Sequence, residues 1–232
     1  MKVGLLADIH GNAAALSAVL DAATAAGVER LLIAGDVVGY YDEPAAVIQQ
    51  LEMWPWQAVR GNHEELLRDR LQDGRWEEAR RRYGSGLRAA SQLPMRIRDR
   101  LVKLPHPLAI EIEDARILLC HGAPWDVWEY VYPDAAPELR DRVFAAASGF
   151  DLVVLGHTHY PMRWQYGSVT VVNPGSVGQP RDRRPGACWA AWDTRTGSVE
   201  FNRQAYDSTS VQTRARRVVP DVPYLWEVLT RS

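Results

Sequence analysis

Histidine, aspartate and asparagine residues gather in five short clusters along the sequence. Each cluster follows an apolar run typical of a buried strand, and each contains glycine. The clusters are Asp8-Ile9-His10-Gly11-Asn12, Gly35-Asp36, Gly61-Asn62-His63-Glu64, His121-Gly122 and Gly156-His157-Thr158-His159. Five of the six histidines fall inside them, and only His106 lies elsewhere, between two prolines. Histidines placed at random would rarely sort in this way, so the pattern indicates one shared site.

Imidazole and carboxylate groups together are typical ligands of a transition-metal site. Zinc, manganese and iron accept such mixed nitrogen and oxygen donors, whereas calcium prefers oxygen alone. Glycine beside a ligand allows the backbone to turn tightly and a substrate to approach closely. Each cluster taken alone is weak evidence, because a single histidine after a strand is usually structural. All five together predict a metal centre.

Apolar runs and helical segments alternate over the first 62 residues. The expected strands are 2–7, 30–34 and 56–59, and the expected helices are 12–26 and 44–51. Such strand–helix–strand repeats are joined by right-handed crossovers and form a parallel sheet. Because ligands bind outside the carboxyl ends of strands in open α/β sheets, the clusters are expected to converge on one rim.

The remainder of the chain changes character twice. Residues 64–103 are charged, arginine-rich and helical in pattern, which predicts helices that either lie over the mouth of the site or present a solvated face. The later part is rich in strands, and Glu113-Asp114 is expected to form the turn of a hairpin. The expected elements there are strands at 108–112, 116–120, 152–155, 162–164, 169–172, 187–192 and 199–202, and a helix at 137–147.

Length and composition are those of a single folded domain spanning residues 1–232. The net charge of −2 argues against the broad cationic surface that binds long nucleic acids. Two cysteines are too few for a disulfide framework, and Cys120 stands in an apolar run, so a buried free thiol is expected. No signal peptide and no apolar run of about 20 residues is present. We therefore expect a soluble, cytoplasmic protein.

The five clusters, in this order, resemble the signatures of the calcineurin-like metallophosphoesterases. The segment Asn173-Pro174-Gly175-Ser176-Val177-Gly178 is similar to that of the smaller bacterial phosphodiesterase branch of this superfamily. The resemblance covers roughly residues 1–205, with the helical region at about 64–103 as an insertion. Residues from about 206 onward form a C-terminal extension without a match, which packs either onto the body or onto a partner. The resemblance implies a four-layer α/β/β/α sandwich and a hydrolase of phosphate esters.

The resemblance also implies two divalent cations held by seven residues. These cations are manganese, iron, zinc or nickel, and manganese is expected to support activity in vitro. A hydroxide shared by them would attack phosphorus, and a bridging carboxylate would offset their repulsion. The expected ligands are Asp8, His10 and His159 for one cation, Asn62, His121 and His157 for the other, and Asp36 for both.

Several residues are expected to act beside the ligands. His63, an imidazole outside the ligand set, would protonate the leaving oxygen or, with Asn62, contact the phosphoryl group. Arg181 is a candidate for phosphate binding by bidentate hydrogen bonds. Its neighbours Arg183 and Arg184 share that possibility, and a solvated loop or a subunit contact is the alternative for all three. Trp125 and Trp128 are candidates either for stacking on a nucleobase or for packing against the helical region. The expected substrate-binding residues are therefore Asn62, His63 and Arg181.

Two positions depart from the related Ser/Thr protein phosphatases. Those enzymes carry Asp and Arg three and four residues after the bridging aspartate, where this chain has Gly39 and Tyr40. Protein phosphatase activity is therefore in doubt, although Glu64 after His63 is phosphatase-like. The residue that orients His63 is left open, with Asp42 as a candidate.

The leading function is hydrolysis of small phosphodiesters. A phosphomonoesterase or a dinucleoside polyphosphate hydrolase is the alternative within enzymes. A non-catalytic scaffold of the same fold is the alternative outside them, but such a protein would have lost some ligands, and all seven are present. A nuclease acting on long DNA is disfavoured by the charge. The natural substrate and the oligomeric state stay open, with a homo-oligomer among the options.

Overall fold

Ten strands form two five-stranded mixed sheets. The computed structural model describes residues 1–231, and its first sheet has the order β10-β9-β1-β2-β3 and its second the order β4-β5-β6-β8-β7. The strands are β1 (Lys2–Leu6), β2 (Arg30–Ile33), β3 (Trp56–Ala58), β4 (Leu108–Ile112), β5 (Ala115–Leu119), β6 (Leu152–Val154), β7 (Met162–Tyr166), β8 (Val169–Asn173), β9 (Ala187–Asp193) and β10 (Val199–Gln204).

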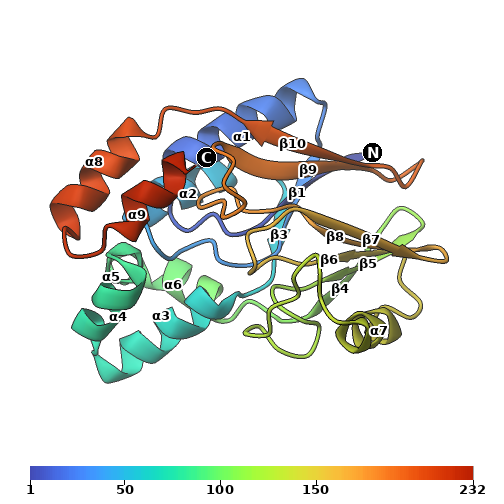
Figure 1. Ribbon diagram of the computed structural model, residues 1–232, viewed down its shortest axis with the longest axis horizontal. Helices are drawn as coiled ribbons and strands as arrows, with labels where there is room; N and C mark the ends of the chain where they lie inside the picture. The colour runs from blue at the N-terminus through green and yellow to red at the C-terminus, as the bar shows by residue number, and fades with distance from the viewer. Residues whose placement is uncertain (232) are drawn as a thin grey trace.

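Helices lie outside the paired sheets and at one end of them (Figure 1). The described helices are α1 (Ala13–Ala25), α2 (Pro44–Leu51), α3 (Asn62–Asp73), α4 (Trp76–Tyr83), α5 (Gly86–Ala90), α6 (Met95–Val102), α7 (Pro137–Ala146), α8 (Thr209–Val218), α9 (Tyr224–Glu227) and the short 3₁₀ helix η1 (Val228–Thr230). No helix within residues 1–231 is long and apolar enough to cross a membrane.

Inner strands such as β1, β6 and β9 bury both of their faces, which is why they read as continuous apolar runs. In β1, Leu6 points to the cluster that contains α1 and α2, whereas Leu5 points into the core between the two sheets. In β5, Leu119 enters that shared core, whereas Leu118 packs on the side of α7. The layers are therefore helix, sheet, sheet and helix, and the expected α/β/β/α sandwich is confirmed (Figure 1).

The pairing of the strands refines the expected parallel sheet. β1, β2 and β3 are parallel, as their crossover helices predict. β9 adds to β1 in the antiparallel direction and β10 adds to β9, so the complete sheet is mixed. The hairpin predicted around Glu113-Asp114 is present as the antiparallel pair β4 and β5.

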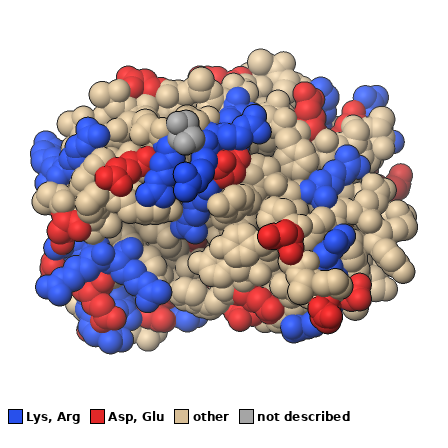
Figure 2. Space-filling model, in the orientation of Figure 1, with Lys and Arg blue, Asp and Glu red and all other residues tan. Residues whose placement is uncertain are grey.

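The C-terminal extension packs back onto the body. Its apolar residues, including Val211 and Leu225, surround Tyr41, whose hydroxyl donates a 3.0 Å hydrogen bond to the Leu225 carbonyl. Arg80 of α4 also forms a bidentate ion pair with Asp221. α8 and α9 thus lie beside α4 and α5 (Figure 1). Figure 2 shows that lysine and arginine side chains gather on this side of the molecule.

Candidate metal centre

Most of the expected ligands have a left-handed backbone conformation at the strand ends. Seven non-glycine residues in the described chain have positive φ, and five of them are expected ligands. Non-glycine residues rarely adopt this left-handed conformation, which costs on the order of 1–3 kcal/mol each and concentrates at functional sites. These five are Asp8, His10, Asp36, His157 and His159, with φ from 52° to 66°.

Backbone hydrogen bonds between the loops hold these turns in place. The amide of His10 donates to the carbonyl of Asp36 at 2.9 Å, and the amide of Asp8 donates to that of Gly35 at 3.2 Å. From the Asn-Pro-Gly-Ser segment, the Ser176 hydroxyl donates to the Asp8 carbonyl at 2.7 Å. The loops therefore support one another through hydrogen bonds that do not involve the expected ligand side chains.

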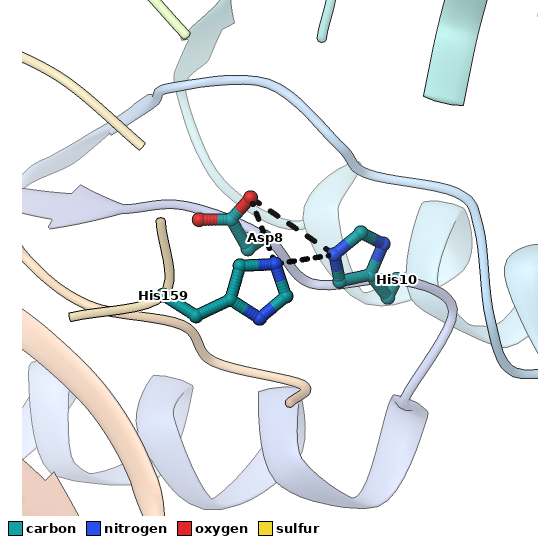
Figure 3. A group of neighbouring side chains, drawn as sticks. All are labelled: Asp8, His10 and His159. Atoms are coloured by element: carbon teal, nitrogen blue, oxygen red, sulfur yellow. Dashed lines mark hydrogen bonds and ion pairs between the residues drawn. The ribbon is translucent and has the colours of Figure 1, made fainter. Parts of the chain in front are cut away.

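Asp8, His10 and His159 form the first group of converging donors (Figure 3). The Nε2 atoms of the two histidines are 3.1 Å apart, and Asp8 Oδ1 lies 3.6 Å from His159 Nε2 and 3.9 Å from His10 Nε2. The Nδ1–H of His159 donates to the Gln179 carbonyl, which leaves a lone pair on Nε2 directed at the group. Three buried donors therefore point at one small volume.

Asp36 connects this first group to a second one. Its Oδ2 lies 3.7 Å from His10 Nε2 and 3.4 Å from His121 Nε2. The Nδ1–H of His121 donates to the Ala34 carbonyl, so its Nε2 faces Asp36 and also Asn62, whose Oδ1 is 2.9 Å away. Burial opposes protonation of this ring, but the Asp36 charge raises the pKa of His121 to about 9, so a cation at Nε2 would take the place of a proton. The Asp36 carboxylate is thus placed between the two sets of donors.

His157 lies beside the second group. Its ring centroid is 4.9 Å from that of His121, and its Nε2–H donates to the Trp128 carbonyl at 3.1 Å. That bond leaves Nδ1 as the ring atom with a lone pair. The His157 amide also donates to both carboxylate oxygens of Asp8, at 3.2 and 3.1 Å. The structure therefore brings all seven expected ligands into one buried neighbourhood.

Burial makes this cluster of charges costly, and a cation would relieve the cost. Burial raises the pKa of Asp8 to about 8. Burial also lowers the pKa of His157 to about 3, which keeps its imidazole neutral and able to coordinate. Asp36 behaves differently: burial opposes its ionisation, but neighbouring histidines, with His121 the strongest, hold its pKa well below the usual range. The donor set thus suits a borderline divalent cation in chemistry and in charge.

Glu64 binds the backbone of the loops and is not itself one of the expected ligands. Its carboxylate accepts hydrogen bonds from the amides of Asp36, Val38 and Gly61, at 2.9, 3.1 and 2.7 Å. One side chain thereby joins the loop after β2 to the beginning of α3. In this chain, the phosphatase-like Glu64 therefore holds two loops together.

His63 converges with His10 and Asp36, and within residues 1–231 no further carboxylate orients its ring. Its Nε2 lies 4.0 Å from Asp36 Oδ2, and its Nδ1 is buried without a partner among residues 1–231. Burial lowers the pKa of His63 to about 4. The suggestion that Asp42 orients it is wrong, because Asp42 pairs instead with Arg214 of the C-terminal extension at 3.0 Å.

The surroundings of Gly39 leave no room for a side chain at the position where the Ser/Thr protein phosphatases carry aspartate. A Cβ atom at this position would lie 2.4 Å from His10 Nδ1 and 2.6 Å from His63 Nδ1, and the φ of 151° is rarely adopted by other residues. Here the two histidine rings are packed by Tyr40, whose ring centroid is 4.5 Å from that of His10 and 4.6 Å from that of His63. A tyrosine therefore takes over the space beside His63.

A cavity of about 150 Å³ opens onto these donors. Arg181 lines it, whereas Arg183 and Arg184 are exposed on the loop outside. Trp128 lines it as well, but Trp125 does not. The cavity is lined by Asp36, Tyr40, Asn62, His63, Arg82, Tyr83, Trp128, Tyr130, His157, His159 and Arg181.

Four of these lining residues were missing from the sequence-based site. In the sequence, Tyr40 is only a departure from the phosphatase pattern, and Arg82, Tyr83 and Tyr130 lie outside the five clusters. None of them stands in a motif, so no local signal could have identified them. The positions of Arg82, Tyr83 and Tyr130 depend on how α4 and the loop before α7 fold over the strand ends, and Tyr40 lies in the loop after β2.

The comparisons with known proteins agree with this geometry. A family model described as calcineurin-like phosphoesterase superfamily domain matches residues 1–197. The phosphodiesterase YfcE of Escherichia coli is 26% identical over 195 residues, covering 80% of this chain and 84% of that protein.

Two solved structures share the fold over almost the whole chain. A metallophosphoesterase from Sphaerobacter thermophilus superposes with a TM-score of 0.79 at 25% identity, covering 98% of this chain and 99% of its own. The hypothetical protein PH1004 from Pyrococcus horikoshii superposes with a TM-score of 0.84 at 22% identity, covering 99% and 98%. The latter likeness concerns the fold alone.

The chain belongs to the calcineurin-like phosphoesterase superfamily. It is a metal-dependent hydrolase of phosphate esters, as the family and its phosphodiesterase relatives establish. The family implies small phosphate esters as substrates, and the described residues offer several groups of converging metal donors.

Proposed function

We propose that the protein is a phosphodiesterase with a dinuclear metal centre. The observation that carries this proposal is the position of Asp36, which lies within reach of His10 on one side and His121 on the other. Asp8 and His159 complete the first set of donors. Asn62, His121 and His157 complete the second, and Asp36 serves both. When bound, two divalent cations lower the pKa of water and neutralise phosphoryl oxygens; manganese is the ion we would supply first.

The direct test is metal content by mass spectrometry with hydrolysis assays on the same sample. After manganese reconstitution, we expect about two metals per chain and turnover of a chromogenic phosphodiester. The relation to the YfcE phosphodiesterase supports a diester rather than a monoester. Turnover of a monoester alone would make the protein a phosphomonoesterase. Two metals without turnover of either ester would favour a dinucleoside polyphosphate substrate, and no metal and no turnover would favour a scaffold.

His63 is the proposed catalytic imidazole outside the ligand set. Its ring lies beside the Asp36 carboxylate, which favours the protonated, proton-donating form, and its amide donates to Asp36 Oδ1 at 2.9 Å. We expect His63→Ala to keep both metals and to lose about 10²- to 10⁴-fold in rate, as general acid catalysis typically contributes. The loss should be largest for esters with poor leaving groups, which depend most on a proton donor. Loss of a metal from this variant would instead make His63 a ligand.

Arg181 is the proposed phosphate-binding residue, and Tyr40 positions it. The guanidinium donates from Nη2 to the Tyr40 hydroxyl at 3.0 Å and to Gln179 Oε1 at 3.2 Å. Its Nε is buried without a partner in the described chain. The phosphoryl group of a substrate would also contact Asn62 and His63, so the arginine would complete a set of donors on one side of the cavity.

Removal of this guanidinium should weaken substrate binding without removing metal. We expect Arg181→Ala to raise KM about 10-fold or more, because charge-assisted hydrogen bonds contribute about 1.5–3 kcal/mol. Tyr40→Phe keeps the ring and removes only the hydroxyl, so a smaller increase in KM is expected. Steady-state kinetics with metal analysis of each variant checks this. An unchanged KM in Arg181→Ala would exclude the proposed contact.

The cellular location, the size of the substrate and the oligomeric state stay predictions. Two buried free cysteines suit a reducing cytoplasm. The net charge of −2 supports a small ester over a long nucleic acid. A homo-oligomer is compatible with these two features, and light scattering would determine the oligomeric state.

A further inference from the structure

Large aromatic side chains are exposed in the segment between β5 and α7. Trp125, Trp128, Tyr130 and Tyr132 are 39–44% exposed, although such rings normally bury most of their surface. Tyr130 and Tyr132 stack with ring centroids 5.5 Å apart, and grouped exposed aromatic rings often mark a binding site. Within this segment, Trp128 and Tyr130 also line the cavity that opens onto the metal donors.

Rings from two separate elements meet at that cavity. Tyr130 stacks on His157 with centroids 4.0 Å apart and planes at 22°. Tyr83 of α4 lies edge-on to His63 with centroids 5.2 Å apart. We call Tyr83, Trp128 and Tyr130 the aromatic rim. The rim therefore begins directly at two histidines of the site and extends outward from it.

The exposed indole of Trp128 is held in a fixed orientation. Its Nε1–H donates to Glu65 Oε2 of α3 at 3.0 Å, and its amide donates to Asp126 Oδ1 at 2.8 Å. Its carbonyl accepts the hydrogen bond from His157. A ring fixed in this way loses little conformational entropy when a partner stacks on it, which favours binding.

The size of the cavity places part of the substrate on this rim. A volume of about 150 Å³ is below the roughly 300–1,000 Å³ of typical ligand pockets. It accommodates the phosphoryl group near the donors, with Arg82 and Arg181 on its walls, but leaves little space for an esterifying group. That group must extend past Tyr83, Trp128 and Tyr130, where the available chemistry is an aromatic face.

We propose that the aromatic rim selects phosphate esters whose alcohol carries a planar aromatic ring, such as an aryl or nucleoside group. This inference rests on the proposed phosphoesterase function and adds a substrate class to it. Trp128 is the specificity-determining residue, because it combines exposure with a fixed orientation. Stacking of a planar ring on an aromatic side chain is worth about 5- to 150-fold in affinity.

The test compares two phosphonates that cannot be hydrolysed as esters, phenylphosphonate and methylphosphonate, by calorimetry on the manganese-loaded protein. We expect phenylphosphonate to bind at least about 10-fold more tightly. Trp128→Ala should reduce this ratio to near one, whereas Trp128→Phe should retain most of it. The affinity for methylphosphonate should change little, because the bond to His157 uses only the backbone carbonyl of residue 128.

Trp125→Ala is the matched control. Trp125 belongs to the same segment and is 39% exposed, but it contacts Glu129 and Arg142 and does not line the cavity. Its loss should leave the ratio unchanged. Since the ratio is taken within one preparation, partial misfolding of a variant does not alter it.

Two results would overturn the inference and differ from failure of the proposed function. Equal affinity of the wild-type protein for both phosphonates, together with diester turnover, would remove only the aromatic selectivity. An unchanged ratio in Trp128→Ala would assign the selectivity elsewhere. If neither phosphonate bound and no ester were hydrolysed, the proposed function itself would fail.

Discussion

Asp36→Asn is expected to abolish most of the activity and to weaken metal binding. The substitution keeps the shape of the side chain and removes the charge that faces both His10 and His121. A neutral amide cannot offset the repulsion between two cations. Loss of outer partners of a metal site typically costs 10- to 100-fold, so loss of a shared ligand should cost more than about 100-fold. Diester turnover and metal content on one preparation measure both effects.

Asp42→Asn provides the matched control for this substitution. Asp42 lies in the same loop, but its carboxylate pairs with Arg214 of the C-terminal extension. The control should retain its metals and most of its rate. Full turnover with two bound metals in Asp36→Asn would refute the assignment of Asp36 as the shared ligand.

Removal of the metal by a chelator is expected to eliminate activity and to lower the melting temperature. Burial, together with the nearby Asp36 charge, makes ionisation of Asp8 costly, and a cation that binds only the folded chain stabilises it. At 100 times the dissociation constant this linkage contributes about 2.7 kcal/mol. For a chain of this size that corresponds to a decrease in Tm of roughly 5–10 °C on removal. Scanning calorimetry with and without manganese measures the difference.

The Asp36→Asn variant separates the metal from other effects of the chelator. Since this variant binds metal weakly, the same treatment should shift its Tm much less. A wild-type Tm that does not respond to chelation or to added manganese would contradict a metal centre built from these residues.

The strand ends that carry the expected ligands could be predicted because their signals are local. An apolar run such as Val3–Ala7 identifies a strand, and the following Asp8 and His10 identify its ligand-bearing end. The parallel order of β1 to β3 followed from the helices between them. The left-handed backbone of five expected ligands could not be read from the sequence, because glycine marks the need for such a conformation only when glycine itself occupies the position.

The rest of the site depends on contacts between distant parts of the chain. Tyr40 and Arg181 are 141 residues apart, and the hydroxyl of Ser176 supports Asp8 across 168 residues. No periodicity of the sequence indicates such pairings. The same holds for β9, which pairs with β1 in the first sheet although it is made from residues 187–193. These features could be found only in the folded molecule.

The spread of the expected donors along the chain determines when during protein synthesis the metal centre can form. The donors are spread from Asp8 to His159, and the apolar residues that cover Tyr41 lie between 211 and 229. At roughly 5–20 residues per second, the ribosome needs about 8–30 s to proceed from residue 8 to residue 159. During that interval the early ligands are present without their partners. The centre is thus assembled late in translation, and selective metal loading must follow the synthesis of most of the chain.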